Sequence, residues 1–356
     1  MILTILSFIF VIGVLVFVHE LGHFLAAKSV GVRVEKFYLG FNFWGLGWKK
    51  IYKGTEYGIG LFPMGGYVKV AGMIDESMDV ETTGAPDEFK SKNMFQKIWI
   101  MSAGVIMNFL LAILIFSHLT YHNGIDDPDP RAIIGDVYPE FPADSLGLKA
   151  GDEILSIDEI SINNWEAMTK QIQSKPEQKI KITWLRNGIE NHGNVITKSN
   201  PQLVKDELID MGMIGIMPLL HHREADFLES ISIGISQTAH VLSLTARSLF
   251  ALAKGNVSMK EMAGPIMIAK IAGETASVGF SALLGLMAFI SINLGFINIL
   301  PIPGLDGGHV IIALIEGIIR RDLPIKIKMG IQQIGILLLL LLFITIMIND
   351  VQRLFQ

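Results

Sequence analysis

The stretch His19-Glu20-Leu21-Gly22-His23 directly follows an uncharged apolar run at residues 2–18. On one continuous helix the two histidines lie one turn apart on the same face, so both imidazoles can reach a single metal ion. Glu20 lies next to them, where its carboxylate can take a proton from water that the metal activates. Because ionisable side chains in a membrane helix are costly unless they are paired or bind metal, this stretch predicts a metal site within a membrane span.

The composition supports a membrane protein. Of the 356 residues, 51% are hydrophobic and 18% are charged, whereas soluble proteins carry about 25% charged residues. The first apolar run lacks the positively charged start and the cleavage site of a secretory signal, so we expect a retained span. The net charge of −5 argues against a nucleic-acid partner, and the absence of cysteine leaves His and carboxylates as metal ligands. Four blocks lack Asp, Glu, Lys and Arg and are long enough, or nearly so, to cross a hydrocarbon core of about 30 Å: residues 2–18, 98–117, 275–305 and 331–348.

The distribution of Lys and Arg predicts the orientation of these spans. Basic residues are concentrated between residues 28 and 97 and again at 320–328, and the positive-inside rule puts both loops in the cytoplasm. The N-terminus, residues 121 to about 275 and the C-terminus then lie outside. Residues 227–253 carry an apolar helical stripe and could form a fifth span. That crossing would put the 320–328 loop outside, so an amphipathic surface helix fits better.

The outer segment contains a pattern typical of a small α+β domain at residues 131–199. Short strand and helix signals alternate through it and end in a hairpin, in which residues 179–186 alternate in strand fashion before the Asn187-Gly188 turn. This order and the run Gly147-Leu-Lys-Ala-Gly-Asp-Glu-Ile-Leu155 resemble a bacterial-type PDZ domain. Another small α+β fold is the alternative.

A zinc site needs a third protein ligand, and the sequence favours Asp306. The metzincin pattern would require a glycine and a histidine where this chain has Ala26 and Ser29. The gluzincin pattern would require a Glu on a helix shortly downstream, but residues 28–97 are typical of basic, glycine-rich loops and strands. Asp306 is the first charged residue after a long uncharged run, within Asn298-Ile-Leu-Pro301-Ile-Pro303-Gly-Leu-Asp306-Gly-Gly.

The expected depths of the ligands are compatible. At a rise of 1.5 Å per residue, His19 lies about 25 Å along the first span and Asp306 roughly 25–40 Å along the third. Both spans run from the outer side inwards, so the residues can meet towards the cytoplasmic face. His309, three residues after Asp306, is a candidate for a supporting contact rather than a ligand.

These motifs together resemble the site-2 protease family, and within it the RseP/RasP-type regulators of bacterial envelope stress. The resemblance also covers Ser102-Ala-Gly104-x-x-x-Asn108 and residues 58–70. It implies that His19, His23 and Asp306 bind Zn²⁺ and that Glu20 is the catalytic base. It further implies that Asn298, Pro301 and Pro303 bind substrate. Some relatives carry two tandem PDZ domains, whereas this chain has room for one.

The segment Gly58-Ile-Gly-Leu-Phe-Pro-Met-Gly65-Gly66-Tyr67-Val-Lys-Val70 is strand-like. A peptide bond in a transmembrane helix is shielded by its own hydrogen-bonded turn, so the helix must unwind before water can attack. The resemblance implies that Gly65, Gly66 and Tyr67 belong to a membrane-embedded sheet edge that pairs with the unwound substrate. The alternative is an ordinary hairpin that packs against the spans.

The predicted fold is therefore a membrane α-helical one, with about four transmembrane helices, a membrane-associated β-hairpin or sheet and one extracytoplasmic PDZ-like α+β domain. The expected segments are a first span at 1–27, a cytoplasmic-side β region at 28–97, a second span at 98–120, the PDZ-like domain at 131–199, a region with the surface helix at 200–274, a third span at 275–310 and a fourth at 331–349.

The predicted function is hydrolysis within transmembrane segments of other membrane proteins, in the bilayer of a bacterial inner membrane. Substrates would be single-span proteins already trimmed by another protease, such as anti-sigma factors, or remnants of signal peptides. A non-catalytic zinc-dependent adaptor acting through its PDZ domain is the alternative, but it would have no use for Glu20. A metal transporter would need polar residues along a path across several helices, whereas here they gather at one depth.

Overall fold

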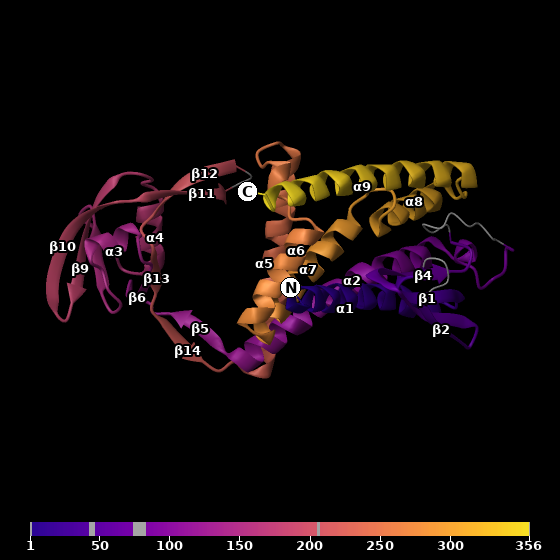
Figure 1. Ribbon diagram of the computed structural model, residues 1–356, viewed down its shortest axis with the longest axis horizontal. Helices are drawn as coiled ribbons and strands as arrows, with labels where there is room; N and C mark the ends of the chain where they lie inside the picture. The colour runs from indigo at the N-terminus through magenta and orange to yellow at the C-terminus, as the bar shows by residue number, and fades with distance from the viewer. Residues whose placement is uncertain (1, 43–46, 74–82, 205–206, 356) are drawn as a thin grey trace. The chain divides into compact units, whose positions relative to one another are not determined.

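The computed structural model describes residues 2–42, 47–73, 83–204 and 207–355 (Figure 1). The contacts divide the chain into two compact units. Unit 1 contains Met1–Leu119, Ser230–Ala246 and Ser258–Gln356, and unit 2 contains Thr120–Glu229 and Arg247–Val257.

The expected spans are helices. Among the described residues, four helices are long and apolar enough to cross a membrane: α1 (Ile2–Ser29), α2 (Met94–Asn123), α7 (Phe280–Ile299) and α9 (Ile325–Arg353). Each contains most of one predicted apolar block. Other helices include α5 (Phe227–Ala253), α6 (Pro265–Val278) and α8 (Asp306–Ile319).

Four helices of unit 1 share one apolar core. Glycines allow two close approaches: a Cβ on Gly22 of α1 would lie 2.5 Å from the carbonyl oxygen of Ala103 in α2, and one on Gly234 of α5 would clash with Ser117 of α2. The surface location of α5 stays a prediction. The buried members of the core come from α1, α2, α6 and α7 and are Val11, Leu15, Ala112, Ile115, Ala272, Leu283, Met287, Ala288 and Ile292.

Residues 275–310, predicted as the third span, do not form one continuous helix; they contain the end of α6, all of α7 and the start of α8. Helix α6 ends at Val278, and Gly279 has a φ of 152°, which a residue with a side chain rarely adopts. Helix α7 then ends at Ile299, and α8 begins only at Asp306. The intervening turn contains Pro301 and Pro303, which lack the N–H group that a continuing helix requires.

The predicted β region of unit 1 is a four-stranded sheet at one end of α1 and α2 (Figure 1). Strand β1 pairs in parallel with β3 and antiparallel with β4, so the order is β2-β3-β1-β4 and β4 is an edge strand. The strands are β1 (Val34–Phe41), β2 (Gly47–Tyr52), β3 (Thr55–Gly60) and β4 (Phe62–Val70), and a 3-10 turn, η2, follows at Phe89–Ser91.

Unit 2 holds the predicted α+β domain, built on a sheet of order β10-β9-β7-β8. Its elements are β5 (Ile125–Pro128), β6 (Ile134–Val137), α3 (Pro142–Leu146), β7 (Glu153–Ile157), β8 (Ile160–Ser161), α4 (Trp165–Gln173), β9 (Lys179–Arg186), β10 (Ile189–Ile196), β11 (Lys198–Val204), β12 (Glu207–Met213), β13 (Ile216–Pro218) and β14 (Leu220–Arg223).

The domain extends beyond the predicted limits of 131–199. Strand β6 pairs with β13, and β5 pairs with β14, so residues on both sides complete the fold. The reason is that the backbone groups of β6 need a partner strand, which comes from a later part of the chain. At the base of the β5–β14 ribbon, hydrogen bonds from His221 and Arg131 hold the pKa of the Asp129 carboxyl well below its usual range.

We predict that residues 124–224 fold alone, because the core of unit 2 lies wholly between Ala132 and Ile214. In this fragment Ile180→Ala should lower the free energy of unfolding by roughly 2–5 kcal/mol, since it leaves a cavity at a side chain that is 0% exposed. Ile189→Ala, at a side chain that is 68% exposed, should change it by less than about 0.5 kcal/mol. Urea unfolding followed by tryptophan fluorescence measures both, and a fragment without a cooperative transition would contradict the prediction.

Candidate metal centre

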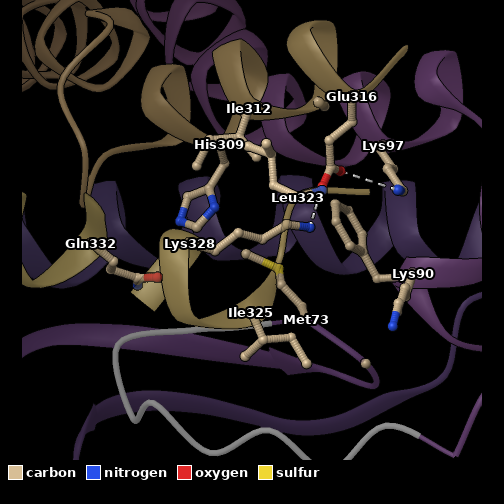
Figure 2. A pocket seen from close by; sticks show the side chains of 13 residues that line it. Met73, Lys90, Lys97, His309, Ile312, Glu316, Leu323, Ile325, Lys328 and Gln332 are labelled. Atoms are coloured by element: carbon tan, nitrogen blue, oxygen red, sulfur yellow. Dashed lines mark hydrogen bonds and ion pairs between the residues drawn. The ribbon is translucent and has the colours of Figure 1, made fainter. Parts of the chain in front are cut away.

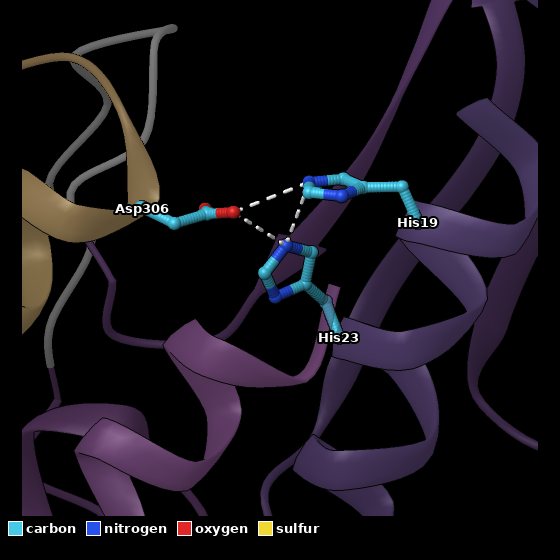
Figure 3. Close-up of side chains that lie close together, drawn as sticks. All are labelled: His19, His23 and Asp306. Carbon is cyan, nitrogen blue, oxygen red and sulfur yellow. Dashed lines mark hydrogen bonds and ion pairs between the residues drawn. The ribbon is translucent and has the colours of Figure 1, made fainter. Parts of the chain in front are cut away.

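Three side chains converge on one point between α1 and α8 (Figure 3). The Nε2 atoms of His19 and His23 lie 3.2 Å apart, and Asp306 Oδ2 lies 3.2 Å from the first and 3.4 Å from the second. A tetrahedral zinc ion with ligand bonds of about 2.0–2.2 Å separates its ligand atoms by roughly 3.3–3.6 Å. Asp306 Oδ2 is buried, and apart from its ion pairs with these two imidazoles it has no hydrogen-bond partner among the described residues. The donor set and its spacing therefore fit a zinc ion.

The break between α7 and α8 brings the carboxylate to this point. Leu305 is extended, and Asp306 begins the first turn of α8. A Cβ on Gly307 would clash with the carbonyl oxygens of Ile299 and Leu300, and one on Gly308 would clash with that of Ile302. The chain can fold back so tightly only because both positions are glycine, and the tight turn aims Asp306 at α1.

Helix α2 supports both imidazoles from behind. The Nδ1–H of His23 donates to the carbonyl oxygen of Ile100 at 2.8 Å, which leaves its Nε2 free to bind metal. The Nδ1 of His19 lies 3.1 Å from the carboxamide of Asn108. Between these contacts, a Cβ on Gly104 would clash with His23 Nε2 and lie 2.7 Å from His19 Cε1. Helix α2 therefore fixes where both rings lie.

Glu20 points to the same space from α1. Its carboxylate lies near both histidines and accepts a hydrogen bond from the backbone N–H of Val68 in β4. Strand β4 approaches α1 closely here, because a Cβ on Gly66 would lie 2.8 Å from Val16 Cγ1. The edge of the sheet thus lies next to the candidate base.

A cavity of about 720 Å³ surrounds this cluster and is lined by His19, Glu20, His23 and Asp306. Of the residues that the resemblance links to substrate, Asn298, Gly65, Gly66 and Tyr67 also line it. Pro301 and Pro303 do not; they form the turn before α8, where Gly304 and Leu305 reach the cavity instead. An extended chain in this cavity would lie along β4.

Sequence reasoning missed Gln332. It lies on α9, lines the same cavity and is 4% exposed, and its Nε2 has no hydrogen-bond partner among the described residues. The pair Gln332-Gln333 within the uncharged apolar block at residues 331–348 was the available signal. His309 lines this cavity, as a supporting residue would, and a smaller cavity beside it.

The smaller cavity, of about 70 Å³, contains a buried ion-pair network (Figure 2). Glu316 of α8 is 2.5 Å from Lys328 Nζ of α9 and 3.5 Å from Lys97 Nζ of α2, and it accepts a hydrogen bond from the backbone of Leu323. Removing one partner of such a network leaves a buried charge uncompensated. The network therefore ties the helix that begins at Asp306 to the helix that supports the histidines.

Comparisons with known proteins identify similar chains. A profile of peptidase family M50 matches residues 7–342. Three relatives bear names that begin "Putative zinc metalloprotease". The one from Clostridium acetobutylicum is 36% identical over 95% of this chain and 94% of its own. The one from Fusobacterium nucleatum is 34% identical over 99% of this chain and 100% of its own. The one from Campylobacter jejuni is 33% identical over 98% of this chain and 93% of its own.

Two solved PDZ domains are similar to part of this chain. The PDZ domain of an SdrC-like protein from Listeria monocytogenes is 20% identical and covers 27% of this chain and 94% of that one, with a TM-score of 0.21. A PDZ domain from Listeria innocua gives the same TM-score at 23% identity.

We predict that Gly104→Ala displaces both imidazoles, because the new methyl group has no room beside them. Zinc affinity should fall by roughly 10–100-fold, the range for residues that orient metal ligands. Gly13→Ala is the matched control in α1, since a Cβ there meets nothing within 4 Å. Metal content by mass spectrometry, after dialysis against a weak chelator, compares the two proteins. Equal zinc content would refute the tight packing at Gly104.

Proposed function

The chain belongs to peptidase family M50, and on this premise we propose that it cuts peptide bonds within transmembrane segments of other membrane proteins. It is a zinc metalloprotease of the multi-pass membrane type. His19, His23 and Asp306 are the proposed zinc ligands. The observation that carries the proposal is their convergence, with Glu20, on one cavity. Four helices apolar enough to span the bilayer, α1, α2, α7 and α9, line this cavity together with β4 and α8.

In the proposed reaction Glu20 acts as general base. When bound, zinc supplies Lewis-acid chemistry that lowers the pKa of water to about 7. Glu20 takes the proton from the attacking water and passes it to the departing amide nitrogen. The hydrogen bond from Val68 orients the Glu20 carboxylate towards the cavity. His19, His23 and Asp306 hold their positions throughout.

We further propose that the substrate binds in extended form along β4. The strand lies at the edge of its sheet and lines the cavity with Gly65, Gly66 and Tyr67. Strand addition uses main-chain hydrogen bonds and would keep a transmembrane segment unwound beside Glu20. Asn298 lines the cavity too and offers a polar contact to a freed peptide group.

The basic loops support a site towards the cytoplasmic face of a bacterial inner membrane, with the α+β domain and both termini outside. The substrates that fit this arrangement are single-span proteins trimmed by another protease, such as anti-sigma factors, or signal-peptide remnants. The adaptor alternative predicts that Glu20 is dispensable, and the first test below separates the two.

Glu20→Gln should keep zinc and lose cleavage by at least about 10²-fold, because an amide cannot accept the proton of water. Glu274→Gln is the control, since this carboxylate is exposed on α6. Purified variants, incubated with a single-span substrate in detergent, are compared by mass spectrometry of the products. Cleavage by Glu20→Gln at the parent rate would reject the proposed base and favour an adaptor.

Asp306→Asn should weaken zinc binding and abolish cleavage, because a neutral amide replaces the only carboxylate in the described metal cluster. Asp126→Asn, at an exposed carboxylate of β5, should alter neither. Zinc per protein chain is measured on both purified variants. Parent-like zinc content in Asp306→Asn would remove Asp306 from the ligand set, whatever the activity.

A further inference from the structure

We infer that Asn108 is a positioning residue that holds His19 in the tautomer able to bind zinc. This inference rests on the proposed ligand set. Asn108 lies on α2 one turn after Gly104 and is 0% exposed. Its carboxamide is 3.1 Å from His19 Nδ1, on the side of the ring opposite Asp306.

The chemistry of imidazole sets the requirement. A neutral ring carries one proton, and a ring that binds metal through Nε2 must carry that proton on Nδ1. A buried Nδ1–H group needs an acceptor, because an unpaired buried donor costs about 1–3 kcal/mol. Among the described residues, the Asn108 side chain is the partner recorded at His19 Nδ1. Its carbonyl oxygen can accept this hydrogen bond, whereas its NH₂ group cannot.

The side-chain oxygen of Asn108 is available to accept a hydrogen bond from His19 Nδ1–H. In the structure its Nδ2 faces His19, and its Oδ1 is buried without a hydrogen-bond partner among the described residues. The oxygen and nitrogen of a carboxamide exchange places by a half-turn about the Cβ–Cγ bond. That turn brings Oδ1 to His19 Nδ1–H and leaves Nε2, which faces Asp306, with its lone pair free for metal.

The comparison with His23 explains why Asn108 matters. His23 Nδ1 faces the main-chain carbonyl of Ile100, which can only accept, so its tautomer is fixed by the backbone. His19 is oriented by a side chain and therefore depends on the residue at position 108. The backbone at Asn108 is itself anchored, because the hydroxyl of Ser291 in α7 donates a hydrogen bond to the main-chain carbonyl oxygen of Asn108 at 2.8 Å.

The competing explanation is that Asn108 only joins helices, as polar side chains often do in membrane proteins. Two substitutions separate the roles. Asn108→Leu keeps the size and removes the acceptor. Asn108→Asp keeps an acceptor but buries a carboxylate, which helps only if it faces a donor. A packing role predicts that Asp is no better than Leu, whereas an orienting role predicts that Asp restores zinc binding.

The experiment measures zinc affinity of the full-length protein in detergent by competition with a chromogenic chelator. Asn108→Leu should bind zinc roughly 10–100-fold more weakly than the parent. Asn108→Asp should stay within a few-fold of the parent, and Ser291→Ala, which removes only the anchor to α7, should remain closer to the parent than Asn108→Leu. Parent-like affinity in Asn108→Leu, or equal weakness in Asn108→Leu and Asn108→Asp, would overturn the inference.

Two further variants, Asn108→Ala and His19→Ala, complete the experiment. If Asn108→Leu does not fold, as judged by circular dichroism, Asn108→Ala replaces it, because it also lacks the acceptor. His19→Ala tests the premise separately. Parent-like zinc affinity in His19→Ala would refute the proposed ligand set, whereas weak binding there, combined with parent-like binding in Asn108→Leu, would refute the role of Asn108 alone.

Discussion

The contact between two imidazole rings and the backbone of α2 is the constraint on which the site depends. A protein interior is packed so closely that one methyl group at Gly104 would clash with both rings. The same approach brings the carbonyl of Ile100 and the side chain of Asn108 to the two Nδ1 atoms. Position, ring orientation and tautomer are thus set by one helix. This close contact requires glycine at positions 22 and 104, because a side chain at either position would keep α1 and α2 apart.

A second constraint is the placement of a carboxylate against these rings in an apolar environment. The prolines and glycines of residues 301–308 end α7, reverse the chain and present Asp306 at the start of α8. Helix α8 is then held by the ion pairs of Glu316 with Lys97 and Lys328. The break in the helix is costly in isolation, since its backbone groups lose their regular partners. It is tolerated here because the irregular segment borders a cavity and packs closely against Gly335 of α9.

The sequence predicted those features that local periodicity determines. The spacing of His19 and His23 on a helix requires only the pitch of the helix, and the four apolar blocks require only their length. Asp306 could be found because an isolated charge after an uncharged run is rare. The burial of Gln332 at the cavity and the contact of Asn108 with His19 could not be found in this way, because they depend on how separate helices pack. The true extent of the α+β domain was also hidden, since β6 pairs with β13 and not with a neighbour in sequence.

The β5–β14 ribbon has an evolutionary consequence. Residues Ile125 and Arg223 are cross-strand partners, so the chain enters and leaves the α+β domain at neighbouring points, about 5 Å apart. The α+β domain is therefore an insertion between the two strands of a hairpin. Recombination can delete it, exchange it or copy it in tandem without altering the separation of the two strand ends. The rest of the chain can then keep its own fold when the α+β domain is lost, exchanged or duplicated.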